Sequence, residues 1–291
     1  MTTTPVLAYD DAQRPAFAQA STDARLIELW LHGRNGLTIG VYSVDIGSFL
    51  GIVQKPIRAI TLGDLQTWAD TLTGAPATRA RRIAVVRSLL SFAVRMGYIP
   101  LNVGAALRSP AITRVLAERI LSEEAVVRML ALERGPRSHA LIRLLYLAAL
   151  RVSEVCGLRW KDCVTRRSGG QVSVIGKRSK VRAILLPASM WAELLKLKGG
   201  AGPDDFVFRS RGSDRMDPVT VQRTVKTAAM RAGLSRAVSP HWLRHSHVSH
   251  ALERGANPAL VRDTAGHADL RITSVYAHAR PNDSSARYLI A

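Results

Sequence analysis

Acidic residues and cysteines are both scarce in this 291-residue sequence. Only 22 aspartates and glutamates stand against 41 lysines and arginines, which leaves a formal net charge of +19 at pH 7. Because such a surplus repels itself in the folded state, it indicates a polyanionic partner. Nucleic acid fits best, since each neutralised phosphate releases counterions. A membrane surface fits less well, because the basic residues are spread along the chain rather than gathered on one amphipathic segment.

The two cysteines, Cys156 and Cys163, are too few for a disulfide framework or a four-thiolate zinc site. We interpret them as reduced core residues. The first thirty residues lack the basic start and apolar run of a signal peptide. Residues 141–150 are the most apolar stretch, but they are about half a bilayer span and Arg143 interrupts them. These absences predict a soluble, cytoplasmic protein with no membrane partner.

Helical periodicity divides the sequence into two predicted domains. Residues 1–20 lack periodicity and are interpreted as a flexible N-terminal tail. Residues 21–103 carry apolar stripes at helical spacing and predict a small helical domain. Residues 104–120 show no sustained pattern and are interpreted as a basic linker. Residues 121–280 form the predicted second domain, and residues 281–291 a C-terminal tail.

The clearest helix of the first domain is predicted from about residue 77 to residue 96, just before Gly97. One face of this helix is apolar and carries Ile83, Val86, Leu90 and Ala93. Arginines lie mostly off that face, which predicts a basic surface that contacts phosphates. The DNA-binding residues that we expect in this domain and in the linker are Arg79, Arg81, Arg82, Arg87, Arg114 and Arg119.

The second domain is predicted to combine helices with one small sheet. The clear β signals are residues 171–175 and 181–186, joined by a turn that contains Lys177 and Lys180. Capping residues predict helices that begin near Ser122, Pro218, Pro240 and Pro258. The expected fold class is therefore mainly α with a small β-sheet: a helical domain followed by an α+β domain.

The densest polar cluster runs from His241 to His247. On a helix, His241, Arg244 and His245 share one face, because their separations are three and four. A zinc pair is one alternative, but Trp242 stands where the glutamate of an HExxH site would be. A polar helix with locally satisfied histidines is another. The third is a phosphate site of arginine and imidazole groups, which the excess positive charge favours.

Several boxes, taken in chain order, resemble the tyrosine recombinase (phage integrase) family. They are residues 150–160 around Arg151, the hairpin segment 174–180 around Lys177, His241-x-x-Arg244-His245, Gly266-His267 and Tyr276. The first domain resembles the family's SAM-like core-binding domain. The length resembles the Xer group and simple two-domain integrases. The resemblance implies a C-shaped clamp on DNA.

The chemistry of metal-free phosphodiester cleavage agrees with these boxes. Tyr276 supplies a phenol whose ordinary pKa of about 10 makes it a nucleophile only once its proton is removed. Arg151 and Arg244 can present planar forks to the non-bridging phosphate oxygens. His241 is the candidate that handles the tyrosine's proton. His267 would donate a hydrogen bond to the phosphate.

The leaving 5′-oxygen needs a proton, for which Lys177 is the candidate and Lys180 the alternative. Lys180 is also expected to contact DNA. Glu154 is interpreted as a residue that orients or neutralises a basic neighbour. The remaining histidines of the cluster are interpreted as structural or supporting groups: His245, His247 and His250.

The resemblance implies a site-specific DNA recombinase that uses neither metal, ATP nor any other cofactor. It would form a 3′-phosphotyrosyl link and exchange strands through a Holliday junction, as a homotetramer, or a heterotetramer with a second recombinase, on double-stranded DNA. Residues 284–291 are expected to bind another protomer. A monomeric enzyme like a type IB topoisomerase and a catalytically inactive DNA-binding regulator are the alternatives.

Overall fold

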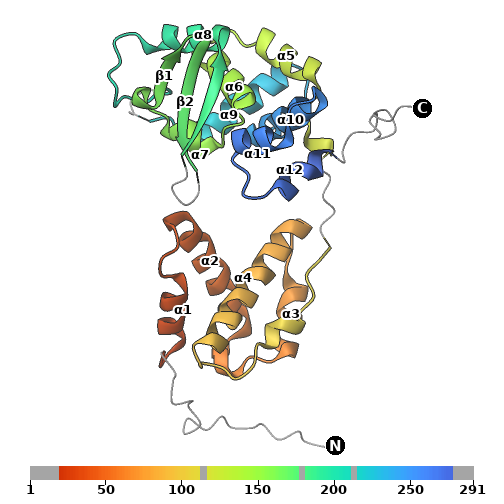
Figure 1. Cartoon of the computed structure of the whole chain (residues 1–291). Coiled ribbons are helices and arrows are strands. Elements are labelled where there is room, and N and C mark those ends of the chain that lie inside the picture. The colour runs from red at the N-terminus through yellow and green to blue at the C-terminus, as the bar shows by residue number, and fades with distance from the viewer. Residues whose placement is uncertain (1–19, 112–116, 177–180, 211–214, 278–291) are drawn as a thin grey trace, which may run out of the picture. The chain divides into compact units, whose positions relative to one another are not determined.

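The computed structural model describes residues 20–111, 117–176, 181–210 and 215–277 (Figure 1). The chain divides into two compact units, residues 1–114 and 115–291. The division falls inside the segment expected to be a linker. Several predictions lie outside the described residues: those for Arg114, Lys177, Lys180 and the two tails.

The first unit consists of helices. They are α1 (Asp23–Leu31), α2 (Gly36–Val53), α3 (Leu62–Thr71) and α4 (Pro76–Arg95), with short 3-10 turns η2 (Ile57–Ala59) and η3 (Val103–Ala106). Thr61 caps α3 in a capping box with Asp64. Trp30, Phe49 and Trp68 fill the core between the helices.

Helix α4 buries the face that its sequence predicts. Ile83, Val86, Leu90 and Ala93 are all buried, whereas Arg81 is exposed. Helix α2 is long and apolar enough to cross a membrane by length and composition alone. However, its Ile46 and Phe49 pack in the core of the unit. Among the described residues, α2 is the helix that meets this test of length and composition.

The second unit combines helices with a three-stranded sheet (Figure 1). Its helices are α5 (Glu123–Ala131), α6 (Pro136–Leu147), α7 (Val152–Gly157), α8 (Ala188–Lys198), α9 (Pro218–Arg231), α10 (Pro240–Glu253), α11 (Pro258–Ala265) and α12 (Leu270–Ala277), with 3-10 turns η4 (Ala117–Arg119) and η5 (Trp160–Asp162). Its strands are β1 (Cys163–Arg166), β2 (Gly169–Ile175) and β3 (Val181–Pro187). The expected fold class is confirmed.

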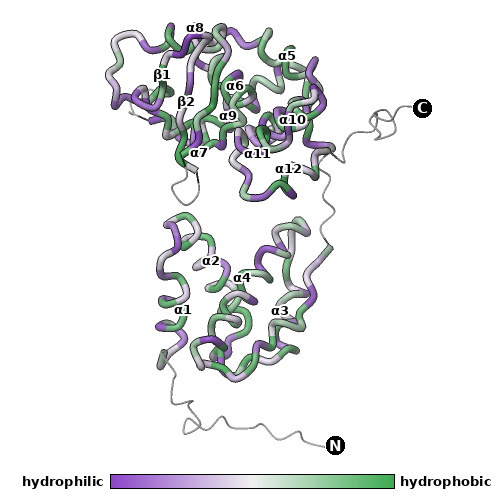
Figure 2. The backbone as a smooth tube through the Cα atoms, viewed as in Figure 1, coloured by the Kyte–Doolittle hydropathy of each residue, from purple (hydrophilic) through white to green (hydrophobic). Residues whose placement is uncertain are grey.

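The sheet is antiparallel in the order β1-β2-β3. Val172 pairs with Ile184 and Ile175 pairs with Val181. Helix α8 packs on one face, where Trp191 lies against Gly170. The hydropathy colouring alternates along the elements, as expected for helices and strands with one buried face (Figure 2).

Helix α10 lies at the centre of the second unit and contacts α5, α6, α9, α11 and α12. Leu243, Val248 and Leu252 anchor it in the core. On the same helix Arg244 and Ser246 are buried, whereas His241 at its start is exposed, so most of this polar segment enters the unit.

Candidate active site

Separate segments of the second unit bring together those predicted catalytic residues that the structure describes. Arg151 caps the N-terminus of α7, and Arg244 lies on α10. His267 follows α11, and Tyr276 lies on α12. Helix α12 packs against both α10 and α11, so the tyrosine lies close to the histidines of these segments.

Arg244 is almost completely buried, with 4% of its surface exposed. Its Nη1 donates a hydrogen bond to the carbonyl oxygen of Ala149 at 2.5 Å. Ala149 has a φ of 49°, a left-handed conformation that costs energy for a residue other than glycine. Burial, together with the nearby charge of Arg151, lowers the pKa of Arg244 to about 10. The guanidinium is therefore still a fixed cation at neutral pH.

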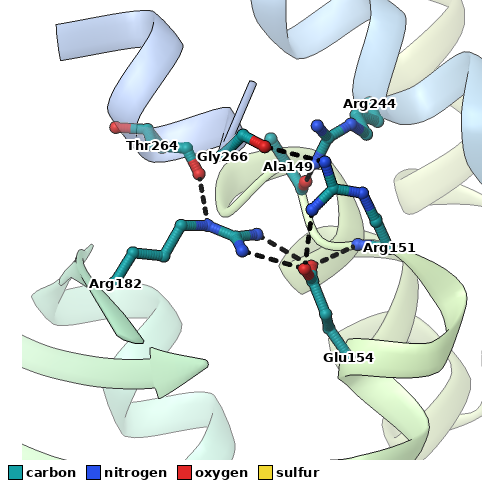
Figure 3. A network of polar contacts seen from close by, with 7 residues as sticks. All are labelled: Ala149, Arg151, Glu154, Arg182, Arg244, Thr264 and Gly266. Atoms are coloured by element: carbon teal, nitrogen blue, oxygen red, sulfur yellow. Dashed lines mark hydrogen bonds and ion pairs between the residues drawn. The ribbon is translucent and has the colours of Figure 1, made fainter. Parts of the chain in front are cut away.

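Arg151 belongs to a network that also contains Glu154 and Arg182 (Figure 3). Its Nη1 donates to Glu154 at 2.9 Å, and its Nη2 donates to the carbonyl oxygen of Gly266 at 2.8 Å. Arg182, on β3, donates from both Nη atoms to the two oxygens of Glu154. Glu154 therefore orients and neutralises basic neighbours, as its position in the sequence suggests.

The turn after α11 places His267 beside the tyrosine. Gly266 ends the helix with a φ of 63°, which favours glycine. The Nδ1 of His267 lies 3.0 Å from the hydroxyl oxygen of the buried Thr273. The imidazole is stacked on the ring of Tyr276, with 6.2 Å between centroids. Burial, Arg244 and Arg151 lower the pKa of His267 to about 4, so the ring is neutral at pH 7.

The hydroxyl of Tyr276 is hydrogen-bonded to His245, whose Nδ1 lies 2.5 Å away. Burial raises the pKa of Tyr276, although the charge of Arg244 opposes this effect. Burial, His241 and Arg244 lower the pKa of His245 to about 4. Both partners are thus neutral at pH 7, so the phenol donates and Nδ1 accepts.

His241 is more exposed than His245, and the centroids of the two rings lie 5.3 Å apart. Partial burial and the charge of Arg244 lower the pKa of His241. The histidine that is hydrogen-bonded to the tyrosine hydroxyl is therefore His245, which sequence analysis interpreted as a structural or supporting group. The spacing in His241-x-x-Arg244-His245 indicates one shared face but does not tell which imidazole meets α12.

The predicted DNA-binding arginines differ in their position and in whether they form ion pairs. The positive charge of Arg119 in η4 lowers the pKa values of His241 and His245, so this residue lies near the site. In the first unit, Arg81 forms an ion pair with the buried Asp45, and the Nε of Arg82 lies 3.7 Å from that carboxylate. Arg79 and Arg87 have no ion pair with a carboxylate among the described residues.

Two other features of the site chemistry concern thiols and metals. Both cysteines are free, and burial raises the pKa of Cys163 to about 12. Among the residues that the structure describes, no three His, Cys, Asp or Glu side chains gather in a way that could hold a metal ion.

Comparisons with known proteins agree with both units. Residues 27–97 match the phage integrase N-terminal SAM-like domain, and residues 119–283 match the phage integrase family. The tyrosine recombinase XerC of Xylella fastidiosa (strain 9a5c) is 33% identical over 265 residues, which cover 86% of this chain and 89% of that protein.

Two solved structures are similar in fold. A XerH site-specific recombinase bound to its difH substrate in a pre-cleavage complex has a TM-score of 0.70 and 21% identity, over 93% of this chain and 84% of that one. A lambda integrase tetramer bound to a Holliday junction has a TM-score of 0.69 and 17% identity, over 86% of this chain and 78% of that one.

The chain belongs to the phage integrase family. Within that family it is a tyrosine site-specific recombinase. The resemblance inferred from the sequence boxes is confirmed.

Proposed function

We propose that this recombinase cuts and rejoins double-stranded DNA through Tyr276, without metal or ATP. The observation that carries the proposal is the convergence of a buried tyrosine hydroxyl, neutral imidazoles and two guanidinium groups from distant parts of one unit. This set can supply a nucleophile, an acceptor for its proton and charge stabilisation for a phosphate.

Cleavage begins when the oxygen of Tyr276 attacks the scissile phosphorus. A Tyr–O–P bond forms and the bond from phosphorus to the 5′-oxygen breaks, so the 3′ end is joined to the enzyme. The fixed charges of Arg244 and Arg151 stabilise the charge on the non-bridging oxygens, and His267 donates a hydrogen bond to them. Lys177, with Lys180 as the alternative, protonates the departing 5′-oxygen.

The phenolic proton passes to His245, because its Nδ1 already accepts the hydrogen bond of Tyr276. His241, beside it, is the group that sequence analysis favours for this task. Attack of a 5′-hydroxyl from a partner strand on the phosphotyrosine then reverses the steps. Because the bond energy is stored in the covalent link, no cofactor is consumed.

The proposed partner is a specific DNA site held by several protomers. The similar structures, which contain recombinases bound to DNA, one of them as a tetramer on a Holliday junction, support this assembly. The net charge of +19 supports extensive phosphate contacts. We propose the first unit as the core-binding domain, with phosphate contacts from Arg79, Arg82 and Arg87, and the cytoplasm as the place of action.

A suicide substrate tests the chemistry. The purified protein is incubated in EDTA with a nicked duplex drawn from DNA that flanks its own gene, beside the Tyr276→Phe variant. We expect a covalent protein–DNA band on denaturing gels that is absent with Tyr276→Phe. Activity that requires added metal, or a covalent band that survives in the variant, contradicts the mechanism.

A further inference from the structure

Arg182 is a tightly held basic residue beside the site that no box of the sequence identifies. It is the second residue of β3, and only 12% of its side chain is exposed. Its Nη1 and Nη2 lie 2.8 and 2.7 Å from the two oxygens of Glu154, and its Nε donates to the carbonyl oxygen of Thr264 at 2.9 Å. Figure 3 shows the guanidinium between Glu154 and the end of α11.

Arg182 also shapes the turn that precedes His267. A Cβ added at Gly266 would lie 3.0 Å from the Nη1 of Arg182 and 3.1 Å from its Cζ. The carbonyl oxygen of the same glycine accepts the hydrogen bond of Arg151. One guanidinium therefore connects β3, the N-terminus of α7 and the turn after α11, where the catalytic groups lie.

Two arginines, Arg151 and Arg182, share the single carboxylate of Glu154, and this sets the net charge of the network. Burial raises the pKa of Glu154, but hydrogen bonds and charge from Arg182 and Arg151 outweigh it, and the pKa is lowered. Glu154 is therefore ionised. With both guanidinium groups in place, the trio keeps one net positive charge. Without Arg182, Glu154 would neutralise Arg151, which would then attract a phosphate less strongly.

We propose that Arg182 is a positioning residue for Arg151. Arg182 shares the carboxylate of Glu154 with Arg151, so Glu154 cannot neutralise Arg151 fully, while its contacts hold Arg151 in one direction for binding the scissile phosphate. The inference rests on the role proposed above for Arg151 in phosphate stabilisation.

The test compares two suicide substrates that differ only at the scissile phosphate. One carries the ordinary phosphodiester, and the other carries a methylphosphonate, which has no negative charge to stabilise. We expect Arg182→Gln to slow single-turnover cleavage of the phosphodiester by about 100-fold, the loss typical of one stabilising group. On the methylphosphonate, the ratio of wild-type to variant rates should fall to below about 10.

A second variant separates charge from shape. In Glu154→Gln/Arg182→Gln, no carboxylate remains to neutralise Arg151, so cleavage of the phosphodiester should recover at least about tenfold relative to Arg182→Gln alone. Arg143→Gln is the matched control, because it removes an ion pair with Glu193 between α6 and α8, away from the site. The ratio of the wild-type cleavage rate to the Arg143→Gln cleavage rate should be the same on both substrates.

The outcomes distinguish a failure of the role proposed for Arg182 from a failure of the proposed function. Because the ratio of the two rates is taken within one preparation, partial unfolding of a variant lowers both rates equally and leaves it unchanged. The role of Arg182 would be overturned if Arg182→Gln cleaved the phosphodiester at the wild-type rate. It would also be overturned by equal losses of rate on both substrates, or by no recovery of the rate in the double variant. If the wild-type protein itself forms no covalent band, the proposed function fails instead.

Discussion

The proposed nucleophile and its proposed base form a neutral pair in the free protein. Tyr276 donates to His245 at 2.5 Å, with the pKa of the phenol raised and that of the imidazole lowered to about 4. The imidazole therefore stays in its basic form at every pH above about 4. An unperturbed histidine, by contrast, would lose that form below about pH 6.5.

The lowered pKa of His245 predicts how the cleavage rate depends on pH. For the wild-type protein, we expect kcat/KM for suicide cleavage to be nearly constant from pH 8 down to pH 6, since this parameter reports the free enzyme. In His245→Asn, the amide oxygen can accept the hydrogen bond but cannot take the proton. The phenol must then ionise to solvent, so the rate should rise about tenfold per pH unit between pH 7 and 9.

His247 is the control for this experiment. It lies on the same helix and burial also lowers its pKa to about 4, but its ring is packed against Tyr146 rather than Tyr276. His247→Asn should keep the flat wild-type profile. A wild-type rate that declines between pH 7 and 6, or a flat profile in His245→Asn, argues against His245 as the acceptor. A steep profile in His241→Asn instead would return that role to His241.

At the scale of elements, the contact between α8 and the sheet depends on a missing side chain. A Cβ at Gly170 would lie 2.1 Å from Cε3 of the buried Trp191. Because an indole in a packed core cannot move freely, we expect Gly170→Ala to lower the free energy of unfolding by about 1–3 kcal/mol. Urea unfolding, followed by tryptophan fluorescence, measures the shift of the midpoint.

Gly157→Ala is the comparison for this substitution. Gly157 ends α7, and a Cβ there would meet nothing within 4 Å. Its unfolding midpoint should equal or exceed that of the wild-type protein, because alanine favours a helix. If both glycine variants have the wild-type midpoint, the close approach of Trp191 to β2 is not a constraint on the fold.

The elements that periodicity and capping specify are those that could be predicted from the sequence. Helices α4, α9, α10 and α11 begin within a few residues of their predicted starts, because proline and capping residues mark them. Strand β1 was missed. It has four mostly exposed residues, so no alternation of apolar side chains indicates it, and it pairs with β2 through backbone hydrogen bonds.

In the candidate site, too, some residues could be predicted from the sequence and others could not. Residues proposed to carry the chemistry, such as Arg244 and Tyr276, stand in boxes that can be recognised in the sequence. Residues that position them do not: Arg182 on β3 meets Glu154 on α7 across 28 positions of the chain, and only the tertiary fold brings these two elements together. The role of His245 depends on how α12 packs on α10, which spacing along one helix cannot determine.

At the scale of the whole molecule, the net charge of +19 has to be divided between arginines that bind DNA and arginines that hold the fold. Arg81 belongs to the second group, because its partner Asp45 is buried. Arg79 and Arg87 lie on the same helix α4 and lack a carboxylate partner among the described residues. The three residues therefore give a matched set on one element.

We expect Arg79→Gln and Arg87→Gln to weaken DNA binding and to reduce the slope of log affinity against log salt concentration by about one each, with little change in the unfolding midpoint. Arg81→Gln should leave the slope unchanged and lower the free energy of unfolding by about 1–3 kcal/mol, since a buried carboxylate loses its nearest partner. Fluorescence anisotropy at several salt concentrations, alongside urea unfolding, measures both quantities. If Arg81→Gln reduces the slope as much as Arg79→Gln does, its ion pair opens on DNA and the basic face of α4 is used as a whole.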